Sequence, residues 1–239
     1  MNNSKGAVGA IIVAAGKGSR MGLGYNKVLS PLCGRPVIEW TLQCFVHSRL
    51  IDHLVLVISP EDEEAMTRVC QSYIEELKIV IVYGGVDRQD SVYNGLRALD
   101  EEVEVVLIHD GARPFIGREL IVRSIDQACI HGAACSGMPV KDTIKIVDEE
   151  KVIRSTPDRA SLWSAQTPQA FKKDIILEAY HIAFEKGIRA TDDACLAELA
   201  GYKVAMFVGD YRNIKLTSPE DLLLAELFMN RQTNLMQNR

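Results

Sequence analysis

The stretch from Ala10 to Lys27 constrains this chain more than any other part of its sequence. It reads AIIVAAGKGSRMGLGYNK, an apolar strand that runs directly into a glycine-rich, cationic loop. Glycines let a backbone approach a ligand closely and turn its N–H groups toward it. Arg20 and Lys27 add two fixed positive charges to the same loop. The pattern predicts a loop that binds polyphosphate, although a tight turn between a strand and a helix would also use glycines.

The spacing of these glycines excludes two common nucleotide-binding fingerprints. The dinucleotide pattern G-x-G-x-x-G is not met, because the third glycine comes one residue late, at Gly22. The phosphate loop of ATPases, G-x-x-x-x-G-K-[ST], is absent as well. The remaining pattern, A-A-G-x-G-x-R-M-G followed by a lysine, resembles the signature of nucleotidyltransferases that load a sugar or polyol phosphate onto a nucleotide.

Length and composition narrow the class of protein. A chain of 239 residues with 47% hydrophobic residues fits one α/β domain, and we expect a single domain over 1–239. The net charge of −5 argues against a general nucleic-acid binder, which would present a basic face. No apolar run reaches the ~18–20 residues that span a bilayer, and the first residues lack the apolar core of a signal peptide. The six cysteines show no metal-ligand spacing, so we expect a reduced, cytoplasmic protein without disulfides or zinc.

Apolar runs alternate with amphipathic segments along most of the chain. The expected strands are Val8–Ala14, His53–Ile58, Ile79–Tyr83, Val103–His109, Ala133–Pro139 and Val204–Val208. The expected helices are Val37–Ser48, Pro60–Leu77, Ser91–Leu99, Arg118–His131, Lys173–Lys186, Asp192–Ala200 and Pro219–Met229. Strands with so little alternation are buried on both faces, which predicts an α/β fold with a mostly parallel, twisted sheet and helices on both faces.

Parallel sheets bind ligands at the carboxyl ends of their strands. We therefore expect the loops that follow the strands to meet at one edge and form one site. These loops are Ala15–Lys27, Gly84–Ser91, Asp110–Phe115 and Gly209–Lys215.

The segment Lys141–Leu162 breaks the alternation of strands and helices. Thr143–Val147 and Val152–Thr156 alternate in polarity around a polar turn, which predicts a β-hairpin. A two-stranded arm is marginally stable alone, so we expect it to pack on something else, most simply a second subunit. The tail from Arg231 onward is expected to be frayed and solvated.

Several polar motifs follow the expected strands. In the first motif, Gly84–Ser91, Asp90 or Ser91 can cap a helix whose free N–H groups could also hold a ligand. In the second motif, Ile108–Phe115, Asp110 could hold hydroxyl groups of a ligand or help carry Mg²⁺. Arg113 of the same motif could hold the turn, bind a substrate hydroxyl or pair with Asp110.

Further polar positions lie toward the C-terminal half. Arg159 is a bidentate donor suited to a phosphate, and the Thr167 hydroxyl can add one hydrogen bond. Thr191 or Asp192 can serve as a helix N-cap. Lys215 follows the last strand and is the candidate functional lysine there.

Together these motifs resemble the 2-C-methyl-D-erythritol 4-phosphate cytidylyltransferases of the non-mevalonate isoprenoid pathway. The resemblance runs from about Val8 to Leu227 and rests on seven motifs in the family's order. They are A-A-G-x-G-x-R-M-G with Lys27, G-G-x-x-R-x-x-S-V, H-D-x-A-R-P-F, D-T-I-K, R-x-x-L-W-x-x-Q-T-P-Q-A-F, T-D-D-A and N-I-K-x-T-x-P-E-D-L.

This resemblance implies a Rossmann-like nucleotidyltransferase fold with a projecting β-arm, about 141–162, that forms a homodimer by embracing its partner. It also implies the transfer of CMP from CTP to methylerythritol phosphate, with release of pyrophosphate. The implied cofactor is Mg²⁺, held mainly by the CTP phosphates with no direct protein ligand.

The resemblance further implies which residues hold CTP. CTP would contact Ala14, Ala15, Gly16, Gly18, Gly85, Ser91, Asp110 and Ala112. Arg20 and Lys27 would hold the triphosphate, and Lys215 would join Lys27 at the α-phosphate. These three cations are the implied catalytic residues.

The implied acceptor site uses a second group of side chains. The polyol phosphate would face Lys215 together with Arg113, Thr143, Thr167 and Thr191, joined by Arg159 of the partner subunit. Two positions depart from the usual family pattern: Val28 stands where glutamine is frequent, and Val86 stands where an acid is frequent. The second departure puts more weight on backbone recognition of the base.

Two alternatives stay open at the level of the sequence. A ribitol-5-phosphate cytidylyltransferase shares almost all the motifs, but that group tends to carry valine where this chain has Ala112. A nucleotide-binding protein without catalytic activity could use the same fold, but it would be expected to lose the cations at positions 20, 27 and 215, all of which are present.

Overall fold

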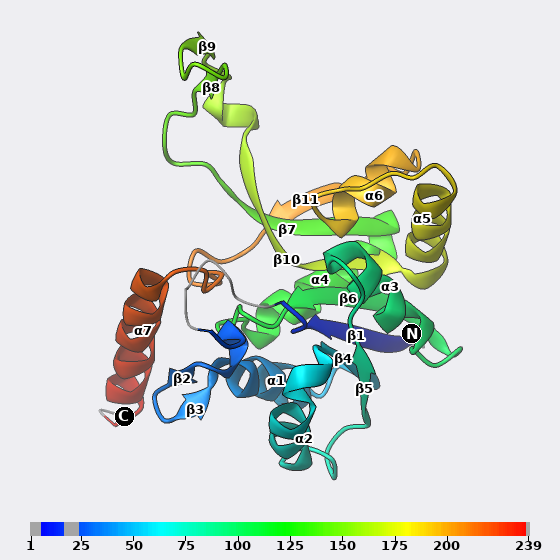
Figure 1. Cartoon of the computed structure of the whole chain (residues 1–239), viewed down its shortest axis with the longest axis vertical. Helices are drawn as coiled ribbons and strands as arrows, with labels where there is room; N and C mark the ends of the chain where they lie inside the picture. The colour runs from blue at the N-terminus through cyan, green and yellow to red at the C-terminus, as the bar shows by residue number, and fades with distance from the viewer. Residues whose placement is uncertain (1–5, 17–23, 238–239) are drawn as a thin grey trace.

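The structure is a computed structural model that describes residues 6–16 and 24–237, with side chains as far as residue 230. In this part of the chain, one seven-stranded sheet has the order β11-β7-β10-β6-β1-β4-β5 (Figure 1). Its strands are β1 (Ala7–Val13), β4 (His53–Ile58), β5 (Ile79–Tyr83), β6 (Val103–Asp110), β7 (Ala133–Pro139), β10 (Trp163–Lys172) and β11 (Ala205–Val208).

The sheet is mostly parallel, as the apolar runs predict. The β1–β4, β1–β6, β4–β5 and β11–β7 pairs are parallel, and β10 is antiparallel to both β6 and β7. Val13 of β1 lies in register with Asp110 of β6 and with Val57 of β4. This register brings the carboxyl ends of the central strands to one edge of the sheet.

The strand β10 is absent from the sequence prediction. Its middle is polar and contains a proline, yet Gln166, Thr167 and Gln169 are all buried there. The pairing of β10 with β7 is interrupted between Ala165 and Gln169, and the Thr167–Pro168 peptide bond is cis. A run this polar indicates a loop by its local pattern, and only the surrounding sheet makes it a strand.

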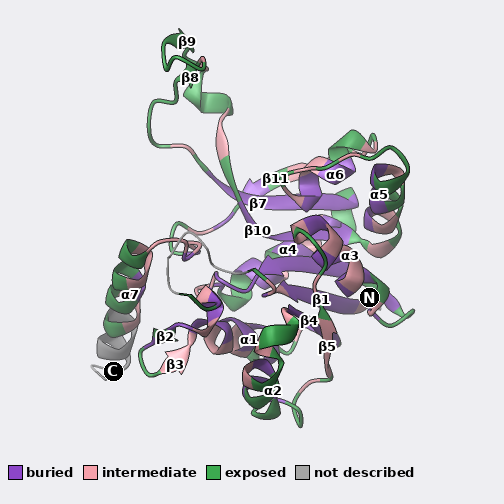
Figure 2. Cartoon of the chain, viewed as in Figure 1, coloured by how far each residue is buried: buried purple, intermediate pink, exposed green. Residues whose placement is uncertain are grey.

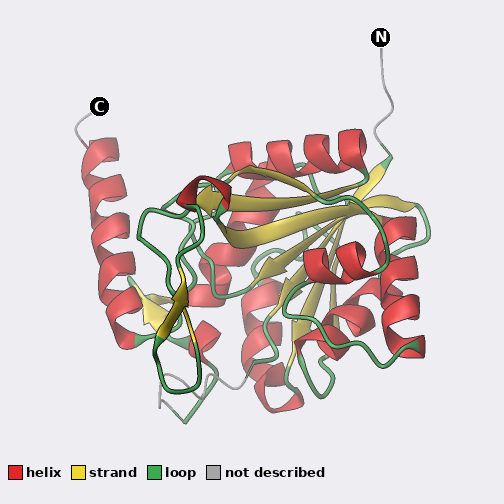
Figure 3. Ribbon diagram, turned by 90° about the horizontal axis from the view of Figure 1, so that it is seen from above, coloured by secondary structure: helices red, strands yellow, loops and turns green. Residues whose placement is uncertain are grey.

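Helices cover both faces of the sheet (Figure 3). One face carries α1 (Val37–Ser48), α2 (Glu63–Gln71) and α4 (Arg118–His131), and the other carries α3 (Arg88–Arg97), α5 (Lys173–Glu185) and α6 (Asp193–Leu199). The expected bounds of α1 and α4 are confirmed. The expected helix Pro60–Leu77 is shorter, with a 3-10 turn η3 (Pro60–Asp62) before α2.

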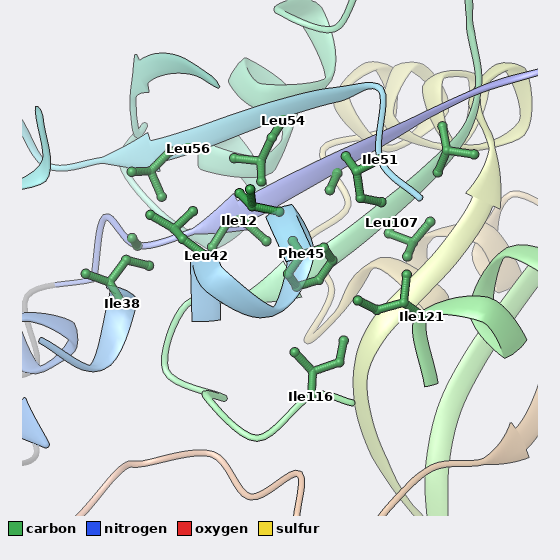
Figure 4. Packing of buried hydrophobic residues seen from close by; sticks show 14 of the residues in the cluster. Ile12, Ile38, Leu42, Phe45, Ile51, Leu54, Leu56, Leu107, Ile116 and Ile121 are labelled. Carbon is green, nitrogen blue, oxygen red and sulfur yellow. The ribbon is translucent and has the colours of Figure 1, made fainter. Parts of the chain in front are cut away.

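The core forms two layers because neighbouring strand residues point to opposite faces. Ile12 packs with Phe45 and Leu54 on the α1 side (Figure 4), whereas Ile11 packs with Val57 on the α3 side. All five side chains are fully buried. The continuous burial of β4 (Figure 2) explains why all its residues after His53 are apolar, without the alternation of a half-exposed strand.

Two helix starts test the predicted caps. Asp87 caps α3, accepting a hydrogen bond from the Asp90 N–H at 2.9 Å, so the prediction that Asp90 or Ser91 caps this helix is wrong. The cap lies earlier because α3 begins at Arg88, three residues before the expected start. Asp192 caps α6 through the Cys195 N–H, which decides between the two expected candidates.

The expected hairpin is present and projects from the body of the molecule (Figure 1). Its paired strands, β8 (Ile146–Val147) and β9 (Ile153–Ser155), are shorter than predicted. Ile146, Val147, Val152 and Ile153 are each about half exposed or more. The arm therefore presents apolar side chains to its surroundings.

The C-terminal helix and two short strands complete the fold. α7 (Pro219–Gln237) continues past Arg231, so the frayed tail expected from the sequence is wrong for the backbone through Gln237. β2 (Pro31–Leu32) and β3 (Arg35–Pro36) form a small hairpin that the sequence prediction lacks. None of the helices in the described residues combines the length and apolar character needed to cross a membrane.

Candidate active site

A pocket of about 410 Å³ lies at the carboxyl edge of the sheet, where the central strands end. Four separate chain segments line it, as expected for loops that follow parallel strands. The predicted site residues that line this pocket are Ala14, Ala15, Gly16, Lys27, Gly85, Ser91, Asp110, Ala112 and Lys215. A larger cavity of about 700 Å³ lies at the opposite edge, around Val103 and Leu177, and none of the predicted residues lines it.

The remaining predicted residues lie elsewhere. Thr143 and Arg159 are exposed on the arm, and Thr191 is exposed just before α6. Arg159 donates to the Lys141 carbonyl at 2.7 Å and begins the short 3-10 turn η4 (Arg159–Ser161). Gly18 and Arg20 lie outside the described residues.

Asp110 is the charged centre of the pocket. Its carboxylate lies 2.8 Å from Lys215 Nζ, 3.5 Å from Arg88 Nε and 3.6 Å from Arg113 Nε. Burial alone would raise the pKa of Asp110, but these three cations together hold it well below its usual range. The carboxylate therefore stays ionised and orients the ammonium group of Lys215.

Two backbone hydrogen bonds join the loops of the pocket. The Leu216 N–H donates to the Ala112 carbonyl at 2.9 Å, which holds Lys215 beside the loop after β6. The Gly111 N–H donates to the Val13 carbonyl at 2.9 Å and joins that loop to the end of β1. Lys27 begins the 3-10 turn η2 (Lys27–Leu29), which follows the glycine-rich loop.

Arg113 pairs with Asp110 and holds the turn, which are two of the roles that the sequence predicts for it. Its side chain is 11% exposed, pairs with Asp110, and donates from Nη1 to the Asn213 carbonyl at 2.8 Å. These contacts tie the loop after β6 to the segment after β11. Arg113 does not line the pocket.

The diglycine loop is packed too closely for side chains. A Cβ atom at Gly84 would lie 2.5 Å from the Ala15 Cβ atom, and one at Gly85 would lie 2.3 Å from the Asp90 Cβ atom. The Gly85 N–H donates to Ser91 Oγ at 3.0 Å, and that hydroxyl donates to the Asp87 carbonyl. The glycines therefore allow this loop to approach the end of β1.

Other groups around the residues predicted to contact the base are already paired or point away. The Ala14 N–H donates to the Val57 carbonyl at 2.7 Å, and the Ala14 carbonyl accepts from Asn26 Nδ2 at 2.6 Å. Val86 is 99% exposed on the same rim. Recognition of a base here would fall mainly to the backbone of Ala15 and the carbonyl of Gly85, because the Gly85 N–H is paired with Ser91.

A buried ion pair that the sequence motifs do not reveal underlies the pocket. Arg88 lines the pocket and donates from Nη2 to Asp193 Oδ2 at 2.8 Å, and Asp193 is 1% exposed. The other Asp193 oxygen accepts from the Tyr180 hydroxyl at 2.6 Å. A buried carboxylate requires such partners. Both residues belong to quoted motifs, but their separation of 105 positions hid the contact.

His109 and Thr167 form a buried hydrogen-bonded chain behind Asp110. His109 Nε2 lies 3.1 Å from the Arg113 carbonyl, and His109 Nδ1 lies 3.1 Å from Thr167 Oγ1. A carbonyl only accepts, so Nε2 carries the proton, and the Thr167 hydroxyl donates to Nδ1. The same hydroxyl accepts the Asp110 N–H at 3.0 Å. Thr167 is therefore already engaged inside the protein.

Carboxylates are sparse around the pocket. Among the residues that the structure describes, no group of three or more His, Cys, Asp or Glu side chains is arranged to hold a metal ion. Asp87 and Asp110 are the acidic residues in the lining, and Asp110 is paired with cations. Magnesium is commonly bound by one or two carboxylates together with substrate phosphates, and this donor set fits that arrangement.

A cationic pocket at the carboxyl edge of such a sheet defines a nucleotidyltransferase-like α/β protein. The IspD family model, described as 2-C-methyl-D-erythritol 4-phosphate cytidylyltransferase, matches residues 8–231. The chain belongs to this family.

Individual relatives agree with the family match. A curated 2-C-methyl-D-erythritol 4-phosphate cytidylyltransferase of Caldanaerobacter subterraneus is 45% identical over 225 residues, covering 94% of this chain and 99% of the relative. One from Syntrophotalea carbinolica is 48% identical over 227 residues, covering 94% and 97%. The solved 4-diphosphocytidyl-2C-methyl-D-erythritol synthase of Anaerococcus prevotii has a TM-score of 0.85 at 35% identity, covering 95% of this chain and 100% of that one.

The buried imidazole predicts a pH dependence of stability. Burial lowers the pKa of His109 to about 4, below the ~6.5 expected in the unfolded chain. The folded state thus binds fewer protons, so His109 costs no stability above pH ~7 and progressively more as the pH falls toward 4. We expect this residue to remove about 2 kcal/mol of unfolding free energy between pH 7 and 5.

Urea unfolding at several pH values checks this prediction. The His109→Gln variant should show a shallower loss of stability over the same range, whatever its stability at pH 7. Equal pH slopes for the two proteins would contradict a neutral, buried His109.

Proposed function

We propose that this chain transfers CMP from CTP to 2-C-methyl-D-erythritol 4-phosphate. The products are 4-diphosphocytidyl-2-C-methyl-D-erythritol and pyrophosphate, in isoprenoid precursor biosynthesis. One observation carries the proposal beyond family membership: Lys27, Asp110 and Lys215 come from separate segments and line one pocket. Two cations around a fixed carboxylate suit a triphosphate that carries a ribose.

The chemistry follows from the charges of the reactants. A phosphate oxygen of the acceptor attacks the α-phosphorus of CTP, and pyrophosphate leaves. A phosphate monoester is already largely deprotonated at pH 7, so neither a protein nucleophile nor a general base is needed. The protein must position two anions in line and stabilise negative charge that accumulates in the transition state. Arg20, Lys27 and Lys215 are the residues proposed for that work.

The pocket suggests how CTP would be held. The backbone of Ala14, Ala15, Gly85 and Ser91 would surround the cytosine. Gly16, Asp110 and Ala112 would lie at the ribose, where carboxylate lone pairs of Asp110 can accept from ribose hydroxyls. Gly18, in the glycine-rich loop after β1, would also contact CTP.

We propose Mg²⁺ as the cofactor, carried mainly by the CTP phosphates rather than by a protein cage. The sparse carboxylates of the pocket support this view. When bound, the ion would neutralise phosphate charge, and Asp110 is a carboxylate of the pocket lining that could assist it.

We also propose that the protein is a cytoplasmic homodimer whose arms complete the acceptor sites. Thr143, Thr191 and Lys215 would serve the polyol phosphate together with Arg159 of the partner subunit, whereas Arg113 and Thr167 are engaged within the protein and would support the site from behind. The projecting arm supports this, because Arg159 is exposed and its hairpin presents apolar residues that a partner would cover.

The acceptor is tested by incubating the protein with CTP, Mg²⁺ and one polyol phosphate at a time while pyrophosphate is measured. We expect release with methylerythritol phosphate, and little with ribitol 5-phosphate. Preference for ribitol 5-phosphate would move the protein to that alternative activity. Binding of CTP with no pyrophosphate released in any arm would support a non-catalytic nucleotide-binding protein.

Loss of one loop cation should slow turnover strongly. We expect Lys27→Ala and Arg20→Ala each to lower kcat by about 10²-fold or more, the scale of removing one donor to transition-state charge. Lys203→Ala, an exposed lysine outside the pocket lining, is the matched control. Near-normal kcat in both loop variants, with folding intact, would refute the assigned mechanism.

A shared acceptor site predicts complementation between two defective proteins. Arg159→Ala should raise KM for methylerythritol phosphate by roughly 10- to 100-fold, the scale of losing charge-assisted hydrogen bonds. When the Arg159→Ala and Lys27→Ala proteins are mixed and exchange subunits, some dimers contain one subunit of each. Each mixed dimer has one site that keeps both Lys27 and Arg159 of the partner subunit. About a quarter of the sites should then be intact, because half of the dimers are mixed and each has one such site.

The mixture is assayed after subunit exchange, at an acceptor concentration where each variant alone is nearly inactive. Arg154→Ala, on the same arm, is the control for general damage to the hairpin. Activity of the mixture equal to the mean of the separate proteins would contradict a site shared between subunits.

A further inference from the structure

We propose that Asn26 is a positioning residue whose amide group joins the two ends of the glycine-rich loop and thereby sets the position of Lys27. The proposal rests on the function proposed for Lys27. Asn26 lines the pocket and is 5% exposed. Its contacts are made to groups on three different parts of the chain.

The hydrogen-bond partners fix the orientation of the Asn26 amide. Nδ2 donates to the Ala14 carbonyl at 2.6 Å and to Asp62 Oδ2 at 2.8 Å, while Oδ1 accepts the Val28 N–H at 3.3 Å. Both partners of Nδ2 can only accept, and the partner of Oδ1 can only donate. The reversed amide would face two oxygens with an oxygen, so the observed orientation alone satisfies all three contacts.

These contacts join segments that the glycine-rich loop would otherwise separate. Ala14 follows β1, where the loop begins, and Asn26 precedes Lys27, where the loop ends. Asp62 closes η3, which follows the neighbouring strand β4, and its carboxylate strengthens the hydrogen bond that it accepts. The amide thus ties the exit of the loop to the sheet edge at its entrance.

The same amide determines where η2 begins, and Lys27 is the first residue of that turn. Asn26 is the N-cap of η2. A buried amide that loses its partners carries a substantial desolvation cost, so this part of the backbone has little freedom to move. A shift of ~1 Å in a group that acts on the transition state can cost ~10²-fold in rate. Asn26 would therefore affect the chemical step without touching the reacting atoms.

Serine at position 26 separates the loop contact from the cap. Serine is a good N-cap and can still accept from the Val28 N–H, but it is too short to replace the bonds to both Ala14 and Asp62. We expect Asn26→Ser to lower kcat by about tenfold or more, with a smaller change in KM for CTP, because Lys27 acts mainly in the transition state. Asn94→Ala, which removes an amide-to-carbonyl bond to Tyr83 outside the pocket, is the matched control.

A second pair of variants tests the contact with Asp62. Asn26→Asp places two carboxylates against each other and removes the donor to Ala14, so it should lower kcat more than Asn26→Ser. Adding Asp62→Asn restores a donor between positions 26 and 62 but not the bond to Ala14. We expect this double variant to recover activity in part, and a double variant no better than Asn26→Asp would contradict the Asp62 contact.

Coupling to Lys27 distinguishes a positioning role from general stabilisation. If Asn26 acts through Lys27, Asn26→Ser should change kcat less than twofold in a Lys27→Ala background. An equal proportional loss in both backgrounds, or a kcat for Asn26→Ser within twofold of the unaltered protein, would overturn the proposal. Thermal unfolding and circular dichroism verify that each variant is folded.

Failure of the proposed function would be visible separately. In that case the unaltered protein releases no pyrophosphate with any acceptor. CTP-induced thermal stabilisation of the Lys27→Ala and Asn26→Ser proteins then provides a readout without turnover. A loss of CTP stabilisation on Asn26→Ser that disappears in the Lys27→Ala background would still support the positioning role, and an unchanged loss there would overturn it.

Discussion

The buried carboxylate of Asp110 is the interaction around which this molecule is organised. It is the last residue of β6, and it holds cations from three other positions: Arg88 from α3, Arg113 from its own loop and Lys215 from the segment after β11. Removing one partner from a buried ion cluster is costly, because the others remain desolvated. The cluster therefore fixes three strand-end loops at once, and the pocket owes its shape to that constraint.

Charge within the pocket differs from charge over the whole chain. The net charge is −5, yet Lys27, Arg88 and Lys215 all line the pocket. Asp193 balances Arg88 from below, which leaves Asp110 to orient Lys215. A locally cationic pocket attracts small anions even in an acidic protein. The positive charge that the sequence predicts for a polyphosphate site is thus local to this pocket.

How much of this could be read from the sequence depends on how local each signal is. The apolar strands and most helix bounds follow from short-range patterns, and they were predicted to within a few residues. The strand β10 was missed because Gln166, Thr167 and Gln169 are polar and are buried only by their tertiary neighbours. The Arg88–Asp193 pair and the Asn26–Asp62 contact were missed for the same reason, since they join positions 105 and 36 residues apart. The pairing of Arg113 with Asp110 was among the predicted alternatives, because the two residues are only three positions apart.

The missed residues share a chemical character that explains their value to the site. Besides Asn26, Gln169 accepts the Ala194 N–H at 2.8 Å and donates to Asp192 at 2.8 Å, and Asn213 donates to the Thr167 carbonyl at 2.7 Å. Each is a buried neutral amide that joins two segments of the chain that lie far apart in the sequence. An amide can donate and accept at once without adding charge, so it can fix loop positions without altering the electrostatics of the pocket. A site for two anionic reactants needs its cations directed at the ligands, and the amides of Asn26 and Asn213 hold the backbone beside Lys27 and Lys215.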